Sequence, residues 1–200
     1  STPMLEVARK RAAGLGNVTF LAADASTAAL PGPFDLLVSR FGVMFFDDPP
    51  AAFTHLRGAL KPGGRLAFVC WRTAAENPWA SVPAQAARKA IGGAAPPADP
   101  HAPGPFAFGD GERLKGILHT AGFAGVSLES FEAPMYLGRS PRSAAEGCTR
   151  IGPASRVALD AGPEHLSTII DAIEVALAPH AASDGSVFLP GRTWVATARA

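Results

Sequence analysis

Two short runs of almost uninterrupted apolar residues most constrain what this chain can fold into. They are Phe34–Ser39 and Arg65–Trp71, and such runs are typical of strands buried on both faces in parallel sheets. Between them, Asp48-Pro49-Pro50 caps a predicted helix whose buried stripe is Ala52, Phe53, Leu56 and Leu60, and which ends at Lys61-Pro62-Gly63-Gly64. A strand, a helix and a second strand at this spacing predict a βαβ unit of a doubly wound α/β sheet.

The residues before Phe34 extend the same alternation. Ser1-Thr2-Pro3 begins a predicted helix. Its apolar residues recur at helical spacing up to Leu15, where Gly14 and Gly16 end the pattern. The β-rich segment Val18–Ala22 predicts a short strand closed by Asp24. The fold class expected is therefore α/β.

The second half of the chain predicts further elements of the same sheet rather than a separate domain. Helices are expected over 80–91, 110–119 and 163–178, and strands over 126–136 and 193–199. Residues 92–108 are dense in glycine and proline, so we expect an irregular, mobile lid or substrate loop there.

Composition excludes several classes of protein. The chain has 200 residues and is 48% hydrophobic, so it is not a disordered chain. Its net charge is +1, so it has no excess of positive charge that would attract a nucleic acid. No apolar run approaches the roughly 20 residues that cross a bilayer. Cys70 and Cys148 are the only cysteines, which favours a reduced, cytoplasmic protein with no zinc site.

Familiar short motifs are absent or misplaced. Gly14-Leu15-Gly16 follows a predicted helix instead of a strand, so it does not fit a nicotinamide-binding loop. There is no Gly-x-Ser-x-Gly elbow and no His-Glu-x-x-His pair, and the five histidines are scattered. His55 falls within a predicted helix and is expected to be exposed.

Three predicted strand ends carry side chains suited to a ligand, because ligands of open α/β sheets bind beyond the carboxyl ends of the strands. They are Ala23-Asp24-Ala25, Ser39-Arg40-Phe41-Gly42 and Cys70-Trp71-Arg72. Asp24 could accept a hydrogen bond from a purine amino group or could only cap its loop. Arg40 could bind a carboxylate or form only a surface ion pair.

Four segments in order resemble class I S-adenosylmethionine-dependent methyltransferases of the ubiquinone/menaquinone C-methyltransferase type. They are Ser1–Ala8, Ala23–Ala25, Phe34–Phe46 and the turn Leu60-Lys61-Pro62-Gly63-Gly64-Arg65-Leu66. The resemblance covers roughly the first 75 residues. It implies a Rossmann-like sheet of strand order 3-2-1-4-5-7-6, with residues 1–75 as a partial cofactor-binding core and 76–200 as the acceptor side of the same domain.

The resemblance also implies site residues and a cofactor, S-adenosylmethionine. The cofactor would contact Met4, Asp24, Ala25, Ser39, Arg40 and Phe41. A small-molecule methyl acceptor would lie against Phe45, Trp71 and Trp79, for each of which plain core packing is the alternative. No catalytic base and no metal ligand is assigned, and neither a nucleic acid nor a membrane is an expected partner.

The chain departs from the family pattern in its first motif. The Gly-x-Gly-x-Gly loop and the ribose-binding acid would both precede Ser1, so we expect the chain to lack the first strands of the family's sheet. Val18–Ala22 would then have no neighbour to pair with. The alternatives to a methyltransferase are a methyltransferase-like interaction module that has lost cofactor binding, and a different transferase, such as an aminopropyl transferase. The acceptor and the oligomeric state stay open.

Overall fold

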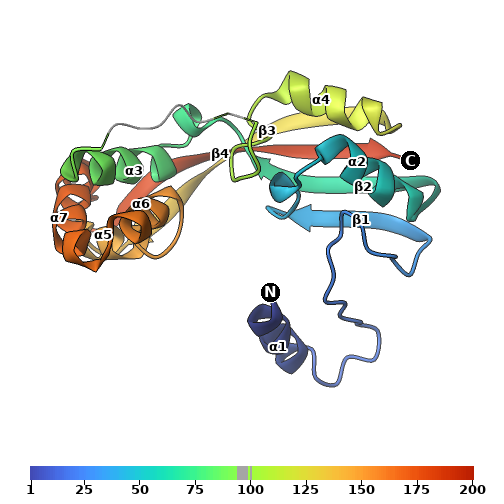
Figure 1. The fold of residues 1–200 in the computed structure, drawn as a ribbon, viewed down its shortest axis with the longest axis horizontal. Coiled ribbons are helices and arrows are strands. Elements are labelled where there is room, and N and C mark those ends of the chain that lie inside the picture. Colours follow the sequence, from blue (N-terminus) through green and yellow to red (C-terminus); the bar gives the residue numbers. More distant parts are fainter. Residues whose placement is uncertain (94–98, 100) are drawn as a thin grey trace.

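The computed structural model describes residues 1–93, 99 and 101–200, and contains a four-stranded mixed sheet (Figure 1). The strands are β1 (Phe34–Arg40), β2 (Leu60–Trp71), β3 (Ala124–Gly138) and β4 (Val187–Arg199), in the order β1-β2-β4-β3. β1 and β2 are parallel, whereas β4 is antiparallel to both of its neighbours. This order matches the 4-5-7-6 end of the expected sheet, so the α/β fold class is confirmed.

Seven α-helices accompany the sheet in the described part of the chain. They are α1 (Thr2–Arg11), α2 (Pro49–Gly58), α3 (Pro78–Ala90), α4 (Gly111–Thr120), α5 (Pro141–Cys148), α6 (Pro153–Ala161) and α7 (Leu166–Leu177). Two begin where the sequence places an aspartate cap: Asp48 accepts from the Ala51 amide at 3.0 Å, and Asp110 accepts from the Glu112 amide at 2.9 Å. The short helices α5 and α6 were not predicted.

One face of the sheet is covered by α2 and α4 (Figure 1). Phe53 of α2, Phe68 of β2 and Phe108 are fully buried here, with ring centroids 5.5–6.5 Å apart. Large aromatic rings that exclude water on all sides are the main favourable contribution to such a core. Ala52, Phe53 and Leu56 of the stripe predicted after Asp48 are buried on α2 as expected. Leu60 is also buried, but as the first residue of β2, because α2 ends at Gly58.

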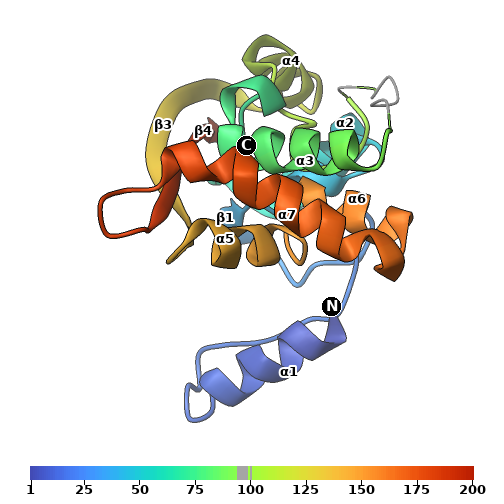
Figure 2. The same ribbon diagram turned by 90° about the vertical axis from the view of Figure 1, so that its left-hand side faces the viewer.

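A second apolar cluster lies beyond one end of the sheet. β3 and β4 run out of the sheet into a group formed by α3, α5, α6 and α7 (Figures 1 and 2). Ile169, Ile173 and Leu177 of α7 are fully buried in this cluster. The molecule therefore has two adjacent apolar cores joined by two long strands.

Two predictions for the first half of the chain are wrong. Val18–Ala22 forms no strand, because no described strand lies beside it to accept its hydrogen bonds. The strand at Phe34 is present but is not buried on both faces: β1 is an edge strand, and its Leu36 and Val38 are 40% and 71% exposed.

The amino-terminal helix stands apart from the sheet (Figures 1 and 2). α1 has no buried residue, and Met4 on its surface is 73% exposed. Residues 12–33, which lead from α1 to β1, contain turns but no helix or strand.

The segment 92–108 is only partly described, since residues 94–98 and 100 lie outside the described residues. Residues 101–108 form turns without a helix or strand, as expected. Their end is anchored, however: the Gly104 amide donates to the Met44 carbonyl at 3.0 Å, and Phe108 is fully buried. The prediction of a loop that is mobile throughout is therefore not supported at Phe108.

Candidate functional site

The carboxyl ends of β1 and β2 lie next to the first turn of α3. Phe41 follows β1, Trp71 ends β2, and Trp79 begins α3. The rings of Phe41 and Trp71 are stacked with centroids 4.5 Å apart, and those of Trp71 and Trp79 are 4.7 Å apart. We call these three residues the aromatic row. The predicted acceptor-side residue Trp71 thus lies between the predicted cofactor residue Phe41 and the second acceptor-side residue, Trp79.

Phe41 has a backbone conformation that is rare for a side chain of its size. Its φ angle is +60°, and it is the one described residue other than glycine with a positive φ. Such a conformation costs about 1–2 kcal/mol in a non-glycine residue, and such outliers cluster at functional sites. In this structure it directs the Phe41 ring onto Trp71, while the Phe41 amide donates to the Val69 carbonyl at 3.0 Å.

Substitutions at Phe41 test this strain. Because only glycine adopts a positive φ without cost, Phe41→Gly should be more stable than Phe41→Ala by about 1 kcal/mol. At Phe45, which lies in the 3-10 helix Val43–Phe45, alanine should be the more stable of the two substitutions. Urea unfolding of the four variants measures both differences. The same order at both positions would contradict the argument.

Asn77 joins the end of β2 to β4 and to α3, and it is fully buried. Its Nδ2 donates to the carbonyls of Arg72, Thr73 and Arg192 at 3.3, 3.0 and 3.1 Å. Its Oδ1 accepts from Trp79 Nε1 at 3.0 Å and from the Arg192 amide at 2.8 Å. The Asn77 amide therefore holds the Trp79 indole in a fixed orientation.

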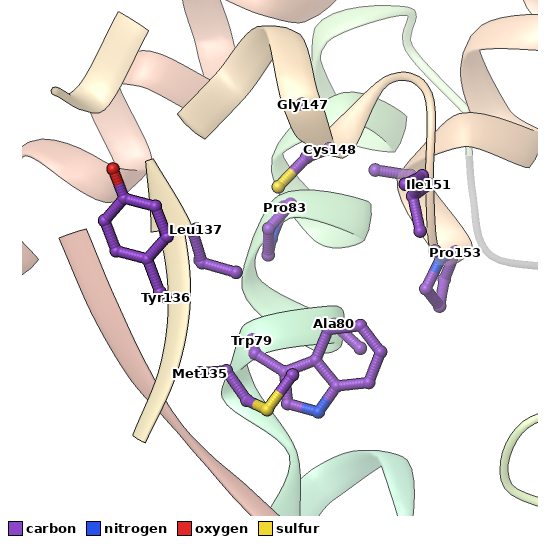
Figure 3. Close-up of a pocket in the computed structure, with 12 residues that line it drawn as sticks. Trp79, Ala80, Pro83, Met135, Tyr136, Leu137, Gly147, Cys148, Ile151 and Pro153 are labelled. Atoms are coloured by element: carbon purple, nitrogen blue, oxygen red, sulfur yellow. The ribbon is translucent and has the colours of Figure 1, made fainter. Parts of the chain in front are cut away.

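A cavity of about 220 Å³ lies on the far side of Trp79 (Figure 3). Its walls come from α3, from β3, and from the end of α5, the start of α6 and the connection between these two helices. Figure 3 shows Met135 and Cys148 with their sulfur atoms toward this space, Ile151 at one side, and the Tyr136 ring directed away. All of the residues that line the cavity are uncharged.

Both cysteine thiols are buried, and burial raises their pKa. The pKa of Cys148 is raised to about 11 and that of Cys70 to about 12, because a thiolate loses hydration in these positions. Both thiols are free.

The raised pKa of Cys148 has a measurable consequence. Only the thiolate reacts with iodoacetamide, so at pH 8 Cys148 should react about a hundredfold more slowly than an ordinary thiol, with the rate rising tenfold per pH unit up to about pH 11. Mass spectrometry of the folded protein measures this, and Cys148→Ser isolates the contribution of Cys70. Rapid labelling of Cys148 at pH 8 would contradict the assignment.

The structure brings together only part of the predicted cofactor set. Ser39, Arg40 and Phe41 are adjacent at the end of β1, where Ser39 Oγ accepts from the Gly42 amide at 3.2 Å. Arg40 is exposed and forms no ion pair with a described residue. Met4 lies on α1, which stands apart, and is not brought to this strand end.

Asp24 and Ala25 are exposed in the connection between α1 and β1. Asp24 Oδ1 accepts from the Ser26 hydroxyl at 2.6 Å and from the Ser26 amide at 2.8 Å. These bonds, the hydroxyl first, hold the pKa of Asp24 below its ordinary value. The loop-capping alternative for Asp24 is thus realised, which leaves cofactor binding as a further role to be tested.

Phe45 and His55, two further residues considered in the sequence analysis, differ in how far they are buried. Phe45 is 55% exposed and lies outside the aromatic row. His55 is half-buried rather than exposed, and its Nε2 lies 2.8 Å from the Ala28 carbonyl oxygen. This contact ties the connection before β1 to α2.

The sequence analysis missed the cavity and the role of Asn77. The cavity walls come from positions 79–83, 135–137 and 147–154, so no local motif marks them. Asn77 does precede Pro78 and Trp79 at the start of a helix, but its partner Arg192 is 115 positions away along the chain.

Two negative findings apply to the described residues. Within them no cluster of three or more His, Cys, Asp or Glu side chains is arranged to bind a metal ion. None of the helices described has the length and apolar character to span a membrane.

Comparison with known families confirms the resemblance. Residues 1–68 match the family described as "Methyltransferase domain". This match and the strand order β1-β2-β4-β3 support the resemblance to class I S-adenosylmethionine-dependent methyltransferases, and they do not specify the ubiquinone/menaquinone subtype.

Curated relatives share the amino-terminal part of the chain. One is the malonyl-[acyl-carrier protein] O-methyltransferase of Magnetococcus marinus, 36% identical over 86 residues, which are 42% of this chain and 32% of that protein. The protein of the same name from Prosthecochloris aestuarii is 41% identical over 56 residues, 28% of this chain and 21% of that protein. The chain therefore spans about a third or less of the length of these relatives.

Solved structures share the fold. The YcgJ protein of Bacillus subtilis has a TM-score of 0.59 at 16% identity, over 100% of this chain and 79% of that one. The Haemonchus contortus phosphoethanolamine N-methyltransferase 2, solved with S-adenosyl-L-methionine, has a TM-score of 0.51 at 18% identity, over 99% of this chain and 41% of that one. At these identities the similarity concerns the fold.

Proposed function

We propose that the protein transfers the methyl group of S-adenosylmethionine to a small-molecule acceptor in the cytoplasm. The observation that carries the proposal is the strained Phe41 at the end of β1, stacked on Trp71 at the end of β2. In open α/β sheets ligands bind at such strand ends, and the match over residues 1–68 favours S-adenosylmethionine as that ligand.

The residues present fit one side of this cofactor. Asp24 is an exposed acceptor whose Oδ2 takes no part in the two bonds from Ser26, so it could accept from the adenine amino group. The backbone of Ser39–Phe41 could line the methionine arm. No glycine-rich loop between a strand and a helix is present among the described residues, so these residues do not explain how the ribose would be bound.

The chemistry requires little beyond position. S-adenosylmethionine supplies a methyl group on a positively charged sulfur, which a nucleophile displaces in line. The residues of this chain would orient the reactants and exclude water, effects that together account for much of the rate in such transfers. The aromatic row lies where the cofactor side, residues 1–75, meets the acceptor side, residues 76–200, so that cofactor and acceptor would come together beside it.

A direct assay tests the proposal. The protein as isolated from its source is incubated with S-adenosylmethionine, or in parallel with decarboxylated S-adenosylmethionine, and a panel of small hydroxy, amino and carboxylic acids. S-adenosylhomocysteine and methylthioadenosine are measured by mass spectrometry. Acceptor-dependent release of S-adenosylhomocysteine is the expected result. Release of methylthioadenosine from decarboxylated S-adenosylmethionine would instead show aminopropyl transfer, and binding of neither compound would favour the interaction module.

A carboxylate presented on a carrier protein is a second candidate acceptor. The name shared by the two curated relatives and their identity of 36% and 41% to this chain favour it. Adding malonyl-loaded acyl-carrier protein to the same assay distinguishes it from a free small molecule.

A polypeptide of residues 1–200 alone should bind S-adenosylmethionine poorly or not at all. The described residues offer only the adenine edge and part of the methionine arm, while close backbone approach requires a glycine loop. Titration calorimetry on this polypeptide measures its affinity. Micromolar binding would show that the cofactor site is misplaced in our account.

A further inference from the structure

The cavity behind Trp79 offers no oppositely charged side chain to a charged group. Its lining consists of aromatic, aliphatic, proline, glycine and sulfur-containing residues. The one thiol, Cys148, is protonated at neutral pH. An ammonium or carboxylate that entered would lose part of its hydration without gaining a counter-charge, which disfavours charged groups there.

The size and chemistry of the walls match a single ring. A cavity of about 150 Å³ lined by apolar side chains holds benzene, and this one is about 220 Å³. Trp79 offers an aromatic surface, and the sulfur atoms of Met135 and Cys148 are soft partners that contact aromatic rings favourably.

The position of the cavity relates it to the proposed reaction. Trp79 forms its wall and is also the last member of the aromatic row, which leads through Trp71 to Phe41 at the end of β1. The cavity therefore lies on the proposed acceptor side, directly next to the aromatic row. Asn77 keeps the Trp79 indole in place.

We infer that this cavity binds a neutral aromatic ring of the methyl acceptor, with one short substituent, and rejects charged rings of the same size. The assignment of the ring to the methyl acceptor rests on the proposed function. The binding of a ring in the cavity does not. The acceptor class is thereby narrowed to small uncharged aromatic compounds.

Ligand-observed ¹⁹F NMR tests the inference with three probes of equal ring size: 4-fluorotoluene, 4-fluorobenzoate and 4-fluorobenzylammonium. The protein should bind the neutral probe at least tenfold more tightly than either charged one. Cys148→Phe, which fills the cavity, should weaken binding of 4-fluorotoluene at least tenfold. Leu159→Phe is the matched control, since Leu159 is 73% exposed on α6 and does not line the cavity.

The outcomes separate the inference from the proposed function. Equal binding of the three probes, or full binding by a folded Cys148→Phe variant, would overturn the inference. If Cys148→Phe fails to fold, Ile151→Asp places a charge at the 80% exposed Ile151 and should still weaken binding of the neutral probe, whereas Leu159→Asp should not. S-adenosylhomocysteine binding, measured in parallel by calorimetry, reports on the proposed function alone.

Discussion

Replacing Asn77 with alanine should lower the free energy of unfolding by about 3–5 kcal/mol, one of the largest effects expected of any polar residue in this chain. At this fully buried position, three backbone carbonyls lose the NH2 group that donates to them. The Arg192 amide and Trp79 Nε1 lose the oxygen that accepts from them. Buried groups left without a partner cost about 1–3 kcal/mol each, reduced where water enters. Thermal unfolding should shift down by roughly 10 °C.

Asn17 is the matched control, because it is exposed and is the other asparagine of the chain. Asn17→Ala should change the free energy of unfolding by less than about 0.5 kcal/mol. Asn77→Ala should also free the Trp79 indole, which a shift in tryptophan fluorescence would show. An Asn77→Ala variant as stable as Asn17→Ala would contradict the network.

Asp24→Ala should weaken S-adenosylmethionine binding by about tenfold to a hundredfold in the protein as isolated from its source. The substitution removes the charged acceptor proposed for the adenine amino group, and hydrogen bonds to charged groups are stronger than those between neutral groups. Asp24 is fully exposed in the structure, so the substitution should leave stability nearly unchanged. Calorimetry with the wild type and the variant measures the change in affinity.

The control for Asp24 is a second turn of the same geometry. Asp184 Oδ1 accepts from the Ser186 hydroxyl at 2.6 Å and from the Ser186 amide at 2.9 Å, as Asp24 does from Ser26. Asp184→Ala therefore removes the same local bonds without touching the proposed site. An equal loss of affinity in both variants, or no loss in either, would remove Asp24 from the site.

The fold was predictable where the signal is local. The aspartate caps at Asp48 and Asp110 and the apolar run after Phe34 correspond to observed elements, because a cap or a strand depends on a few adjacent residues. Burial was less predictable. Val38 is as apolar as a core residue, but its exposure follows from the place of β1 at the sheet edge, which depends on the whole topology.

The site was predictable only in part, for the same reason. The strand ends that carry Phe41 and Trp71 follow from the order of elements, and their contact is observed. The network of Asn77 and the cavity depend on β3, β4 and the unpredicted helices α5 and α6. Contacts between residues so far apart along the chain leave no periodic pattern in the sequence.

Amide hydrogen exchange with and without S-adenosylhomocysteine tests the central claim most directly. In the protein as isolated from its source, the account predicts slower exchange on binding at two separate places, residues 24–26 and residues 39–42. Residues 184–186, which form the matching turn, should exchange at the same rate in both states. Protection at neither place when the ligand is saturating, or no binding at millimolar concentration by a folded protein, would contradict the claim that the turn at Asp24 and the end of β1 bind the cofactor.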